Sequence, residues 1–235
     1  MSKILFNNQL TKSIYEIGVE GSFEGAMGQF YMVRAWEDYP VLSRPLSIHD
    51  LENDKIVFLY RVCGEGTRII SNKKPGDEIS LEGPYGNGFP MVKGRIALVG
   101  GGLGTAPLRF AAKTLWNSHP ERLDIYLGYS DEDINSNRFS SFADSIRIDI
   151  GGFVTEMLNP SDYDVIFTCG PEPMMEAVAR KAKSAKAKVF VSMEKRMACG
   201  IGACLVCTCS TKNGNRKTCK DGPVFDGEDV FFDEL

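Results

Sequence analysis

Five of the seven cysteines in this 235-residue chain lie between positions 199 and 219. Four of them have the plant-type ligand spacing of a 2Fe–2S cluster, namely Cys199-x4-Cys204-x2-Cys207 and then Cys219. A loop around such a cluster must deliver three thiolates from a short arc, and Gly200 and Gly202 give it the necessary backbone freedom. The spacing predicts a small C-terminal 2Fe–2S domain, residues 194–235, with these four cysteines as iron ligands.

Disulfides and zinc account for the cysteine cluster less well. A disulfide framework is disfavoured because the chain is large, shows no secretory leader and has an odd number of thiols. Zinc sites normally use two C-x2-C pairs, whereas only Cys204 and Cys207 form one here. Cys209 could replace Cys219 as a ligand, but a neighbouring buried thiol is the simpler interpretation.

Composition excludes several classes of partner. The net charge of −4 and the pI near 5.4 supply no basic surface for a phosphate backbone, so no nucleic-acid partner is expected. No stretch approaches eighteen consecutive apolar residues, and no basic and apolar leader opens the chain. We therefore expect a cytoplasmic protein without a membrane span.

The pattern of apolar residues changes along the chain. Segments 11–19, 28–36, 54–62 and 77–83 are rich in β-branched and aromatic residues, which is typical of an antiparallel barrel or sandwich. Four buried-strand runs then alternate with helix-like segments, at 95–100, 123–128, 164–170 and 188–193. The sequence predicts an all-β barrel domain over 1–92 and a parallel α/β domain over 93–193.

Two short motifs in the first domain suit a flavin dinucleotide. One is Arg44-Pro45-Leu46-Ser47, at the end of a β-like segment, and the other combines Tyr60-Arg61 with Gly66-Thr67 before a short helix. A fixed guanidinium and a helix start opened by glycine are suited to a pyrophosphate, and a hydroxyl such as that of Ser47 can bond a flavin nitrogen. Each motif is weak by itself, and their order along the chain gives them weight.

Two motifs in the second domain suit a nicotinamide nucleotide. The first predicted strand of this domain leads into Gly100-Gly101-Gly102-Leu103-Gly104-Thr105 and an apolar helix, so that backbone and helix N-terminus can approach a diphosphate. A later strand ends in Cys169-Gly170-Pro171. After the strand at 123–128 come Asp131, Glu132 and Asp133, and carboxylates disfavour a 2′-phosphate, so we expect NADH rather than NADPH.

Together these motifs resemble the ferredoxin-NADP reductase superfamily, and within it the electron transfer subunits of dihydroorotate dehydrogenase B. The resemblance covers essentially the whole chain, and its most specific part is the run from Met197 to Cys207 joined to residues 219–225. Leu46 departs from the superfamily's aromatic residue, and Tyr60 is a candidate substitute for stacking on the flavin. The resemblance implies three sets of ligand-binding residues, for FAD, nicotinamide nucleotide and iron: Arg44, Pro45, Leu46, Ser47, Leu59, Tyr60, Arg61, Gly66 and Thr67; Gly100 to Thr105 with Cys169, Gly170 and Pro171; and the four cysteines.

The resemblance also implies a function. Hydride would pass between NADH and FAD, single electrons would pass through the 2Fe–2S cluster, and a separate FMN-containing subunit would convert dihydroorotate to orotate in a heterotetramer. No catalytic acid or base is implied for the hydride transfer. Two alternatives stay open: a reductase subunit of another complex, such as a sulfide dehydrogenase, ferredoxin:NADP oxidoreductase or hydrogenase, and a zinc-stabilised interaction module. Phe231 and Phe232, set among acidic residues, form either a solvated end or an anchor for the partner.

Overall fold

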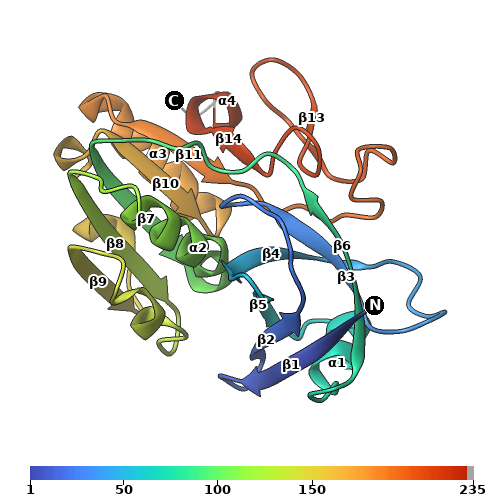
Figure 1. Cartoon of the computed structure of the whole chain (residues 1–235). Coiled ribbons are helices and arrows are strands. Elements are labelled where there is room, and N and C mark those ends of the chain that lie inside the picture. Colours follow the sequence, from blue (N-terminus) through green and yellow to red (C-terminus); the bar gives the residue numbers. More distant parts are fainter. Residues whose placement is uncertain (232–235) are drawn as a thin grey trace.

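The computed structural model describes residues 1–231, so Phe232 and the acidic residues after it lie outside the described part. The first third of the chain is a closed antiparallel barrel with strand order β1-β2-β5-β4-β3-β6 (Figure 1). Its elements are β1 (Ser2–Gln9), β2 (Ile14–Glu20), β3 (Phe30–Arg34), β4 (Arg44–Leu51), β5 (Lys55–Arg61), α1 (Glu65–Ser71) and β6 (Glu78–Tyr85). The barrel prediction is confirmed.

Alternating side chains fill the barrel. Ile17, Ile48, Ile56 and Phe58 are fully buried, as period-2 alternation in strands with one face turned inward requires. One detail of the sequence prediction was wrong. Arg44 opens strand β4 instead of ending a strand, because the segment 44–51 pairs with β3 on one side and β5 on the other.

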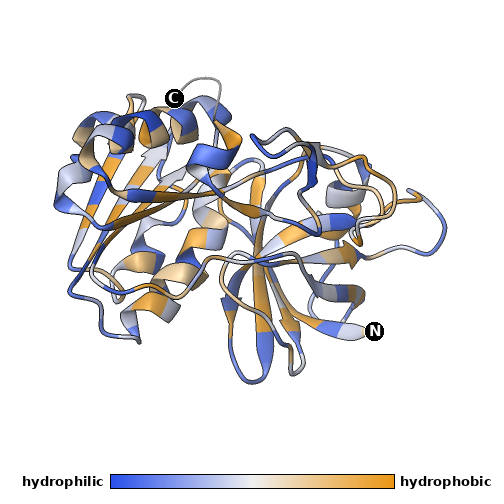
Figure 2. Ribbon diagram, turned by 90° about the horizontal axis from the view of Figure 1, so that it is seen from above, coloured by the Kyte–Doolittle hydropathy of each residue, from blue (hydrophilic) through white to orange (hydrophobic). Residues whose placement is uncertain are grey.

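The second layer is a six-stranded sheet in the order β14-β11-β10-β7-β8-β9, flanked by helices. Its elements are β7 (Arg95–Gly101), α2 (Thr105–Trp116), β8 (Arg122–Tyr129), β9 (Ser145–Ile150), β10 (Val165–Cys169), α3 (Glu172–Ala185) and β11 (Lys188–Ser192). Short 3-10 turns cover Gly102–Gly104, Ser136–Phe139, Val154–Met157 and Pro160–Asp162. The predicted parallel α/β arrangement is confirmed, and Figure 2 shows apolar residues along the strands of both layers.

The C-terminal segment returns to this sheet. It contains a small hairpin, β12 (Thr208–Cys209) with β13 (Arg216–Lys217), then β14 (Val224–Asp226) and α4 (Gly227–Val230). Strand β14 pairs antiparallel with β11, Ser192 opposite Val224. The cysteine-bearing segment, residues 193–223, is therefore a long excursion between two neighbouring strands. The domain limits at 92/93 and 193/194 stay predictions.

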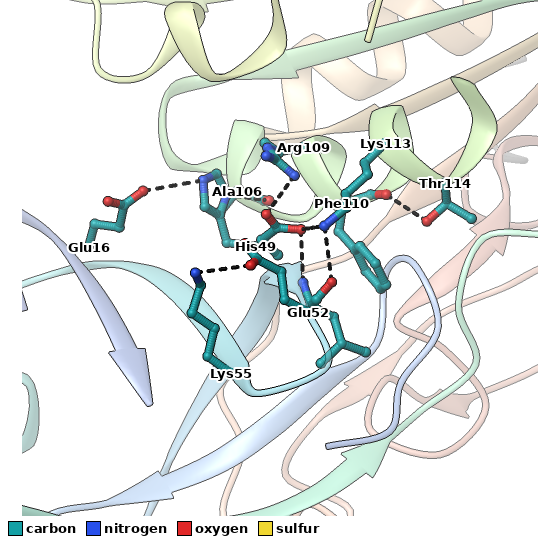
Figure 3. Close-up of polar contacts among 11 residues, drawn as sticks. Glu16, His49, Glu52, Lys55, Ala106, Arg109, Phe110, Lys113 and Thr114 are labelled. Atoms are coloured by element: carbon teal, nitrogen blue, oxygen red, sulfur yellow. Dashed lines mark hydrogen bonds and ion pairs between the residues drawn. The ribbon is translucent and has the colours of Figure 1, made fainter. Parts of the chain in front are cut away.

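Barrel and sheet meet through buried charges (Figure 3). Asp50 at the end of β4 forms ion pairs with Arg109 and Lys113 of α2, both at 2.8 Å. His49 donates from Nδ1 to the carbonyl of Ala106 at 2.9 Å, and its Nε2 lies 3.9 Å from Glu16. Burial lowers the pKa of His49 to about 4, so the ring is neutral near pH 7. Within residues 1–231, no helix is long and apolar enough to cross a bilayer.

Candidate dinucleotide cleft and iron–sulfur loop

A large cavity opens at the carboxyl ends of the parallel strands. The order of the sheet reverses between β7 and β10, which is the point where open α/β sheets bind ligands. A cavity of about 760 Å³ lies there. The predicted residues that line it are Gly101, Gly102, Leu103, Gly104, Gly170 and Pro171. The structure thus brings together the two nicotinamide motifs, which are more than sixty residues apart in sequence.

The two motifs pack backbone against backbone. A Cβ atom on Gly104 would lie 2.3 Å from the carbonyl oxygen of Cys169, and one on Gly170 would lie 2.9 Å from the amide nitrogen of Gly101. Only glycine permits this approach. Gly100, Thr105 and Cys169 do not line the cavity, because they are buried behind it. Their role is to shape the turn, and burial raises the pKa of the Cys169 thiol, which keeps it neutral.

Sequence reasoning missed one wall of the cleft. The loop after β9 contributes Gly151, Gly152 and Phe153, and α3 contributes Met174 and Ala177. Asp149 holds this loop by accepting a hydrogen bond from the Gly152 amide at 2.7 Å. The Gly-Gly-Phe sequence directly after an alternating segment was the available signal.

Two charged side chains line the cavity, Arg61 from β5 and Glu194 from the link that follows β11. Within residues 1–231, neither forms an ion pair within 4 Å. Glu194 is exposed to the open cavity, yet the surrounding wall removes enough water to raise its pKa, and Arg61 opposes the rise. Arg61 therefore links the flavin motif to the nicotinamide cleft.

Arg44 and Gly66 meet on the outer side of the barrel. A Cβ atom on Gly66 would lie 2.7 Å from Nε of Arg44, so the guanidinium crosses the first turn of α1 only because residue 66 is glycine. The same guanidinium lies over the ring of Trp36, 5.4 Å from its centroid. Within residues 1–231 it has no carboxylate partner. Its Nη1 donates to the carbonyl oxygens of Leu42 and Ser43, so the group is held in place without an ion-pair partner. A fixed guanidinium of this kind beside a helix start fits a pyrophosphate.

The other predicted flavin residues have more varied surroundings. Thr67 caps α1: its hydroxyl accepts hydrogen bonds from the amides of Cys63 and Gly64 at 3.1 and 3.2 Å. Leu59 packs against Ala106 and Leu103 of the neighbouring layer. In β4, the partly buried Pro45 and Ser47 are paired with Met32 and Phe30 of β3, respectively.

The idea that Tyr60 offers a stacking surface for the flavin was wrong. Its side chain is completely buried in the barrel core, and its hydroxyl donates to Oδ1 of Asn7 at 3.0 Å. Leu46 is also part of the barrel core. Strand alternation turns both side chains inward, so neither can stack on a flavin ring.

The acidic run after β8 is exposed but does not line the cavity, whose wall at this point ends with Ser130. Asp133 instead closes a turn, because its carboxylate accepts hydrogen bonds from the amides of Asn135 and Ser136. The shortage of positive charge is a better basis for a preference for NADH over NADPH. Arg61 is the one basic residue along the described cavity wall.

The four predicted iron ligands gather in the segment 193–223 and interact two by two, Cys199 with Cys204 and Cys207 with Cys219. Two thiolates for each of two irons is the arrangement that a four-cysteine 2Fe–2S cluster requires. Within residues 1–231, no three His, Cys, Asp or Glu side chains gather closely enough to hold a single metal ion.

Backbone amides point at the sulfur atoms. The amide of Ala203 donates to Sγ of Cys199 at 3.3 Å, and the amide of Cys219 donates to Sγ of Cys207 at 3.4 Å. Hydrogen bonds from the backbone, that of Cys204 foremost, lower the pKa of Cys199 to about 6, whereas burial raises the pKa of Cys219 to about 12. Amide donors aimed at the sulfur atoms stabilise the negative charge of iron-bound thiolates, so the loop fits the group it is predicted to hold.

Cys209 lies apart from these four. It belongs to the apolar core between α3 and β11, whereas Cys207 and Cys219 pack against Phe30 and Met32 of β3. Burial raises the pKa of Cys209. These surroundings support the interpretation of Cys209 as a structural thiol.

Comparison with solved structures defines the class. The chain is similar to the NADH-dependent reduced ferredoxin-NADP oxidoreductase, with a TM-score of 0.88 and 28% identity over 100% of this chain and 91% of that one. A ferredoxin NADP+ reductase from Neisseria gonorrhoeae with bound FAD and NADP shares the fold, with a TM-score of 0.62 and 16% identity over 78% and 90% of the two chains. The protein is thus of the ferredoxin-reductase class, with an added four-cysteine segment.

That segment and the full sequence identify the family. Residues 194–231 match the family model of the iron–sulfur cluster binding domain of dihydroorotate dehydrogenase B. The chain is 42% identical to the "Dihydroorotate dehydrogenase B (NAD(+)), electron transfer subunit" of Clostridium acetobutylicum, over 100% of this chain and 98% of the relative. It is also 42% identical to that of Clostridium perfringens, over 98% and 97%. The chain belongs to the family of dihydroorotate dehydrogenase B electron transfer subunits.

Proposed function

We propose that this chain passes electrons between NAD(H) and an FMN-containing dihydroorotate dehydrogenase subunit, through FAD and a 2Fe–2S cluster, in pyrimidine biosynthesis. One observation carries the proposal. Strand β3 packs against Cys207 and Cys219 through Phe30 and Met32, and the same two residues pair with Ser47 and Pro45 of the flavin motif. A single strand therefore separates the iron ligands from the flavin site.

The residues have distinct roles in this scheme. When bound, FAD would supply the hydride and single-electron chemistry that joins the nicotinamide to the cluster, and the protein supplies binding and orientation. Arg44 holds the pyrophosphate of FAD across the first turn of α1, and Gly66 leaves room for it. The turn from Gly100 to Thr105 and the Cys169–Pro171 motif hold the nicotinamide nucleotide against the flavin side of the cleft, where Arg61 lies. Cys199, Cys204, Cys207 and Cys219 bind the iron.

The partner docks on the cysteine-bearing segment, residues 193–223, which we call the cluster loop. Ile201, Leu205 and Val206 are each more than half exposed beside the four cysteines, and clustered exposed apolar side chains mark interaction sites. We infer that the catalytic subunit covers them, in a cytoplasmic heterotetramer. Electrons then leave the chain where the iron ligands come nearest to the surface, at Cys204.

NADH is the preferred nucleotide in this proposal. Apart from Arg61 on the flavin side, the described wall of the cleft offers no cation to the 2′-phosphate of NADPH. Binding NADPH would therefore leave a phosphate dianion unpaired, which is costly. We expect kcat/KM for flavin reduction to be at least tenfold higher with NADH than with NADPH. Equal values would show that the cavity wall does not set the specificity.

The test of the proposed function is reconstitution. Each component alone, and both together, would be assayed for NAD-dependent orotate formation from dihydroorotate. We expect NADH oxidation with ferricyanide by this chain alone, and orotate formation with NAD only in the mixture. Orotate formation by this chain alone would contradict the proposal, and failure of the mixture with NADH oxidation intact would point to another partner enzyme.

A second candidate is supported by the fold comparison. The similarity to the NADH-dependent reduced ferredoxin-NADP oxidoreductase extends over the full chain. A reductase subunit serving another partner would use the same cleft, flavin site and cluster loop. The identity of the protein that accepts electrons from the cluster distinguishes the two candidates.

A further inference from the structure

The loop between β3 and β4, residues 35–43, carries exposed apolar side chains and contributes no residue to the wall of the dinucleotide cleft. Tyr39 is 73% exposed, Val41 72% and Leu42 44%. Three exposed apolar side chains within four residues concentrate apolar surface on one short loop, whereas isolated exposed apolar residues are ordinary.

The loop has a fixed shape. The guanidinium of Arg34 donates to the carbonyl oxygens of Trp36 at 3.0 Å and Val41 at 2.7 Å, and also to those of Glu37 and Asp38. The indole nitrogen of Trp36 donates to the carbonyl of Pro40. A preorganised loop loses little conformational entropy when a partner binds, so its apolar surface contributes more to affinity.

The β3–β4 loop and the cluster loop are both held by strand β3. Met32 of β3 packs against Cys207 and Cys219, and Arg34, two residues later, holds the β3–β4 loop. Two residues of strand span about 7 Å. Both loops extend on the side of the molecule away from β9 (Figure 1).

The cluster loop alone is too small for a stable interface. A standard interface buries about 800 Å² on each partner, from about 20–30 residues, and the cluster loop offers three exposed aliphatic side chains. We propose that the β3–β4 loop is the second half of the docking surface for the FMN-containing catalytic subunit. This inference rests on the proposed function and extends its contact from the iron site to the flavin domain.

The β3–β4 loop is also in contact with the flavin motif, through Trp36. The guanidinium groups of Arg34 and Arg44 both lie over the ring of Trp36, 5.6 and 5.4 Å from its centroid. Arg34 fixes the docking loop, and Arg44 belongs to the flavin motif. The proposed docking loop and the predicted FAD-binding residue Arg44 therefore both pack on Trp36.

The test uses the full-length holoprotein and the purified catalytic subunit. In the double variant Tyr39→Ser with Val41→Ser, the dissociation constant should rise at least tenfold, with FAD content, iron content and ferricyanide reduction unchanged. The matched control is Ile150→Ser, which removes an equally apolar side chain, 54% exposed, from β9 on the opposite side. Its dissociation constant should stay within twofold of the wild-type value.

The outcomes separate the inference from the proposed function. An unchanged dissociation constant in the double variant, with Leu205→Ser weakened, would overturn the role of the β3–β4 loop alone. Loss of FAD from the double variant would assign the loop to the flavin. Hydrogen exchange of the wild-type chain gives an independent readout: the subunit should protect residues 36–43, and no protection would overturn the inference. A wild-type chain that does not bind the subunit would overturn the proposed function and the inference with it.

Discussion

The dinucleotide cleft and the cluster loop are built on opposite principles. The cleft is concave, and its central contact is backbone against backbone, where Gly104 meets Cys169 and Gly170. The cluster loop is an excursion with apolar side chains turned to the surface and thiols buried to different degrees. A small ligand that binds and dissociates is held in a preformed hollow, whereas clustered exposed apolar side chains mark a contact with another protein. The difference supports the proposed assignment of the cleft to NAD(H) and of the cluster loop to the partner.

The two regions also depend on different parts of the fold. The cleft takes most of its wall from the α/β layer and Arg61 from the barrel, so it requires both bodies in register. The cluster loop is attached to the α/β sheet at both ends and packs on β3 of the barrel. A substitution at one site should therefore leave ligand binding at the other site largely unchanged.

The largest effect is expected at the iron. Cys219→Ser should abolish iron binding and electron transfer to the catalytic subunit, because it removes one of the two ligands of an iron. FAD content should remain near the wild-type value, since the flavin residues lie across β3. Cys209→Ser is the matched control and should keep its iron. Iron analysis and the visible absorption spectrum check both variants, and iron lost from Cys209→Ser but kept in Cys219→Ser would invert the ligand assignment.

A methyl group in the cleft should produce the converse phenotype. Gly104→Ala places a Cβ atom 2.3 Å from a backbone oxygen that cannot rotate away. We expect flavin reduction by NADH to slow by about 100-fold or more, because small displacements of a reacting pair are that costly. Iron should be retained. Gly102→Ala, where no atom lies within 4 Å but the backbone is left-handed, should have a smaller effect. Stopped-flow reduction distinguishes them, and equal rates would refute the tight contact.

Acid should loosen the contact between barrel and sheet. Burial holds the pKa of His49 near 4, below its ordinary value of 6.5, and Arg109 and Arg138 lower it further while Asp50 raises it. The unfolded chain therefore binds this proton more readily, and stability is greatest above pH 6.5 and falls toward pH 4. The expected loss is about tenfold in the folding equilibrium per pH unit in that window.

The variant His49→Asn isolates this contribution, because the amide can still donate to the carbonyl of Ala106 but does not titrate. Denaturant unfolding at several pH values should give a flatter profile for the variant than for the wild type. Glu16 faces the same ring, and burial raises its pKa, so the comparison of slopes and not the wild-type slope alone is the measurement. Parallel profiles would contradict the assignment to His49.

The smallest effect is expected at Gly66. An added methyl group would push the guanidinium of Arg44 off the first turn of α1. FAD affinity should fall about fivefold, or ~1 kcal/mol, the scale of one hydrogen bond. Gly64→Ala is the matched control, because no atom lies within 4 Å of its added Cβ and its backbone is extended. FAD titration of the apoprotein measures both, and similar affinities would show that Arg44 does not need this space.

Sequence reasoning found the motifs but not all of their surroundings. The barrel, the parallel layer and the cysteine spacing follow from local patterns. Strand β9 was missed because most of its side chains are exposed or only partly buried, which weakens the apolar pattern. Strand β14 was missed because three residues are too few for any period. The Gly151–Phe153 wall of the cleft was missed because it depends on where β9 lies.

Tyr60 shows why side-chain roles are harder to predict than motifs. The strand 55–61 is apolar at nearly every position, so alternation alone does not show which face lies inside the barrel. Only closure of the barrel places Tyr60 beside Asn7. Thr67 and Asp133 illustrate a related difficulty: short polar side chains close local turns as readily as they bind ligands, so their predicted roles at the two nucleotide sites stay predictions.

The pairing of Ser192 with Val224 has a consequence for how this architecture can be altered. The amide of Met193 donates to the carbonyl of Pro223 at 2.8 Å, so the segment between them leaves and re-enters the molecule at one point. An insert with adjacent ends behaves as an exchangeable cassette. A short connector between β11 and β14 would turn the chain into a plain nucleotide-dependent flavin reductase, and a different metal-binding loop grafted at the same two residues would redirect its electrons.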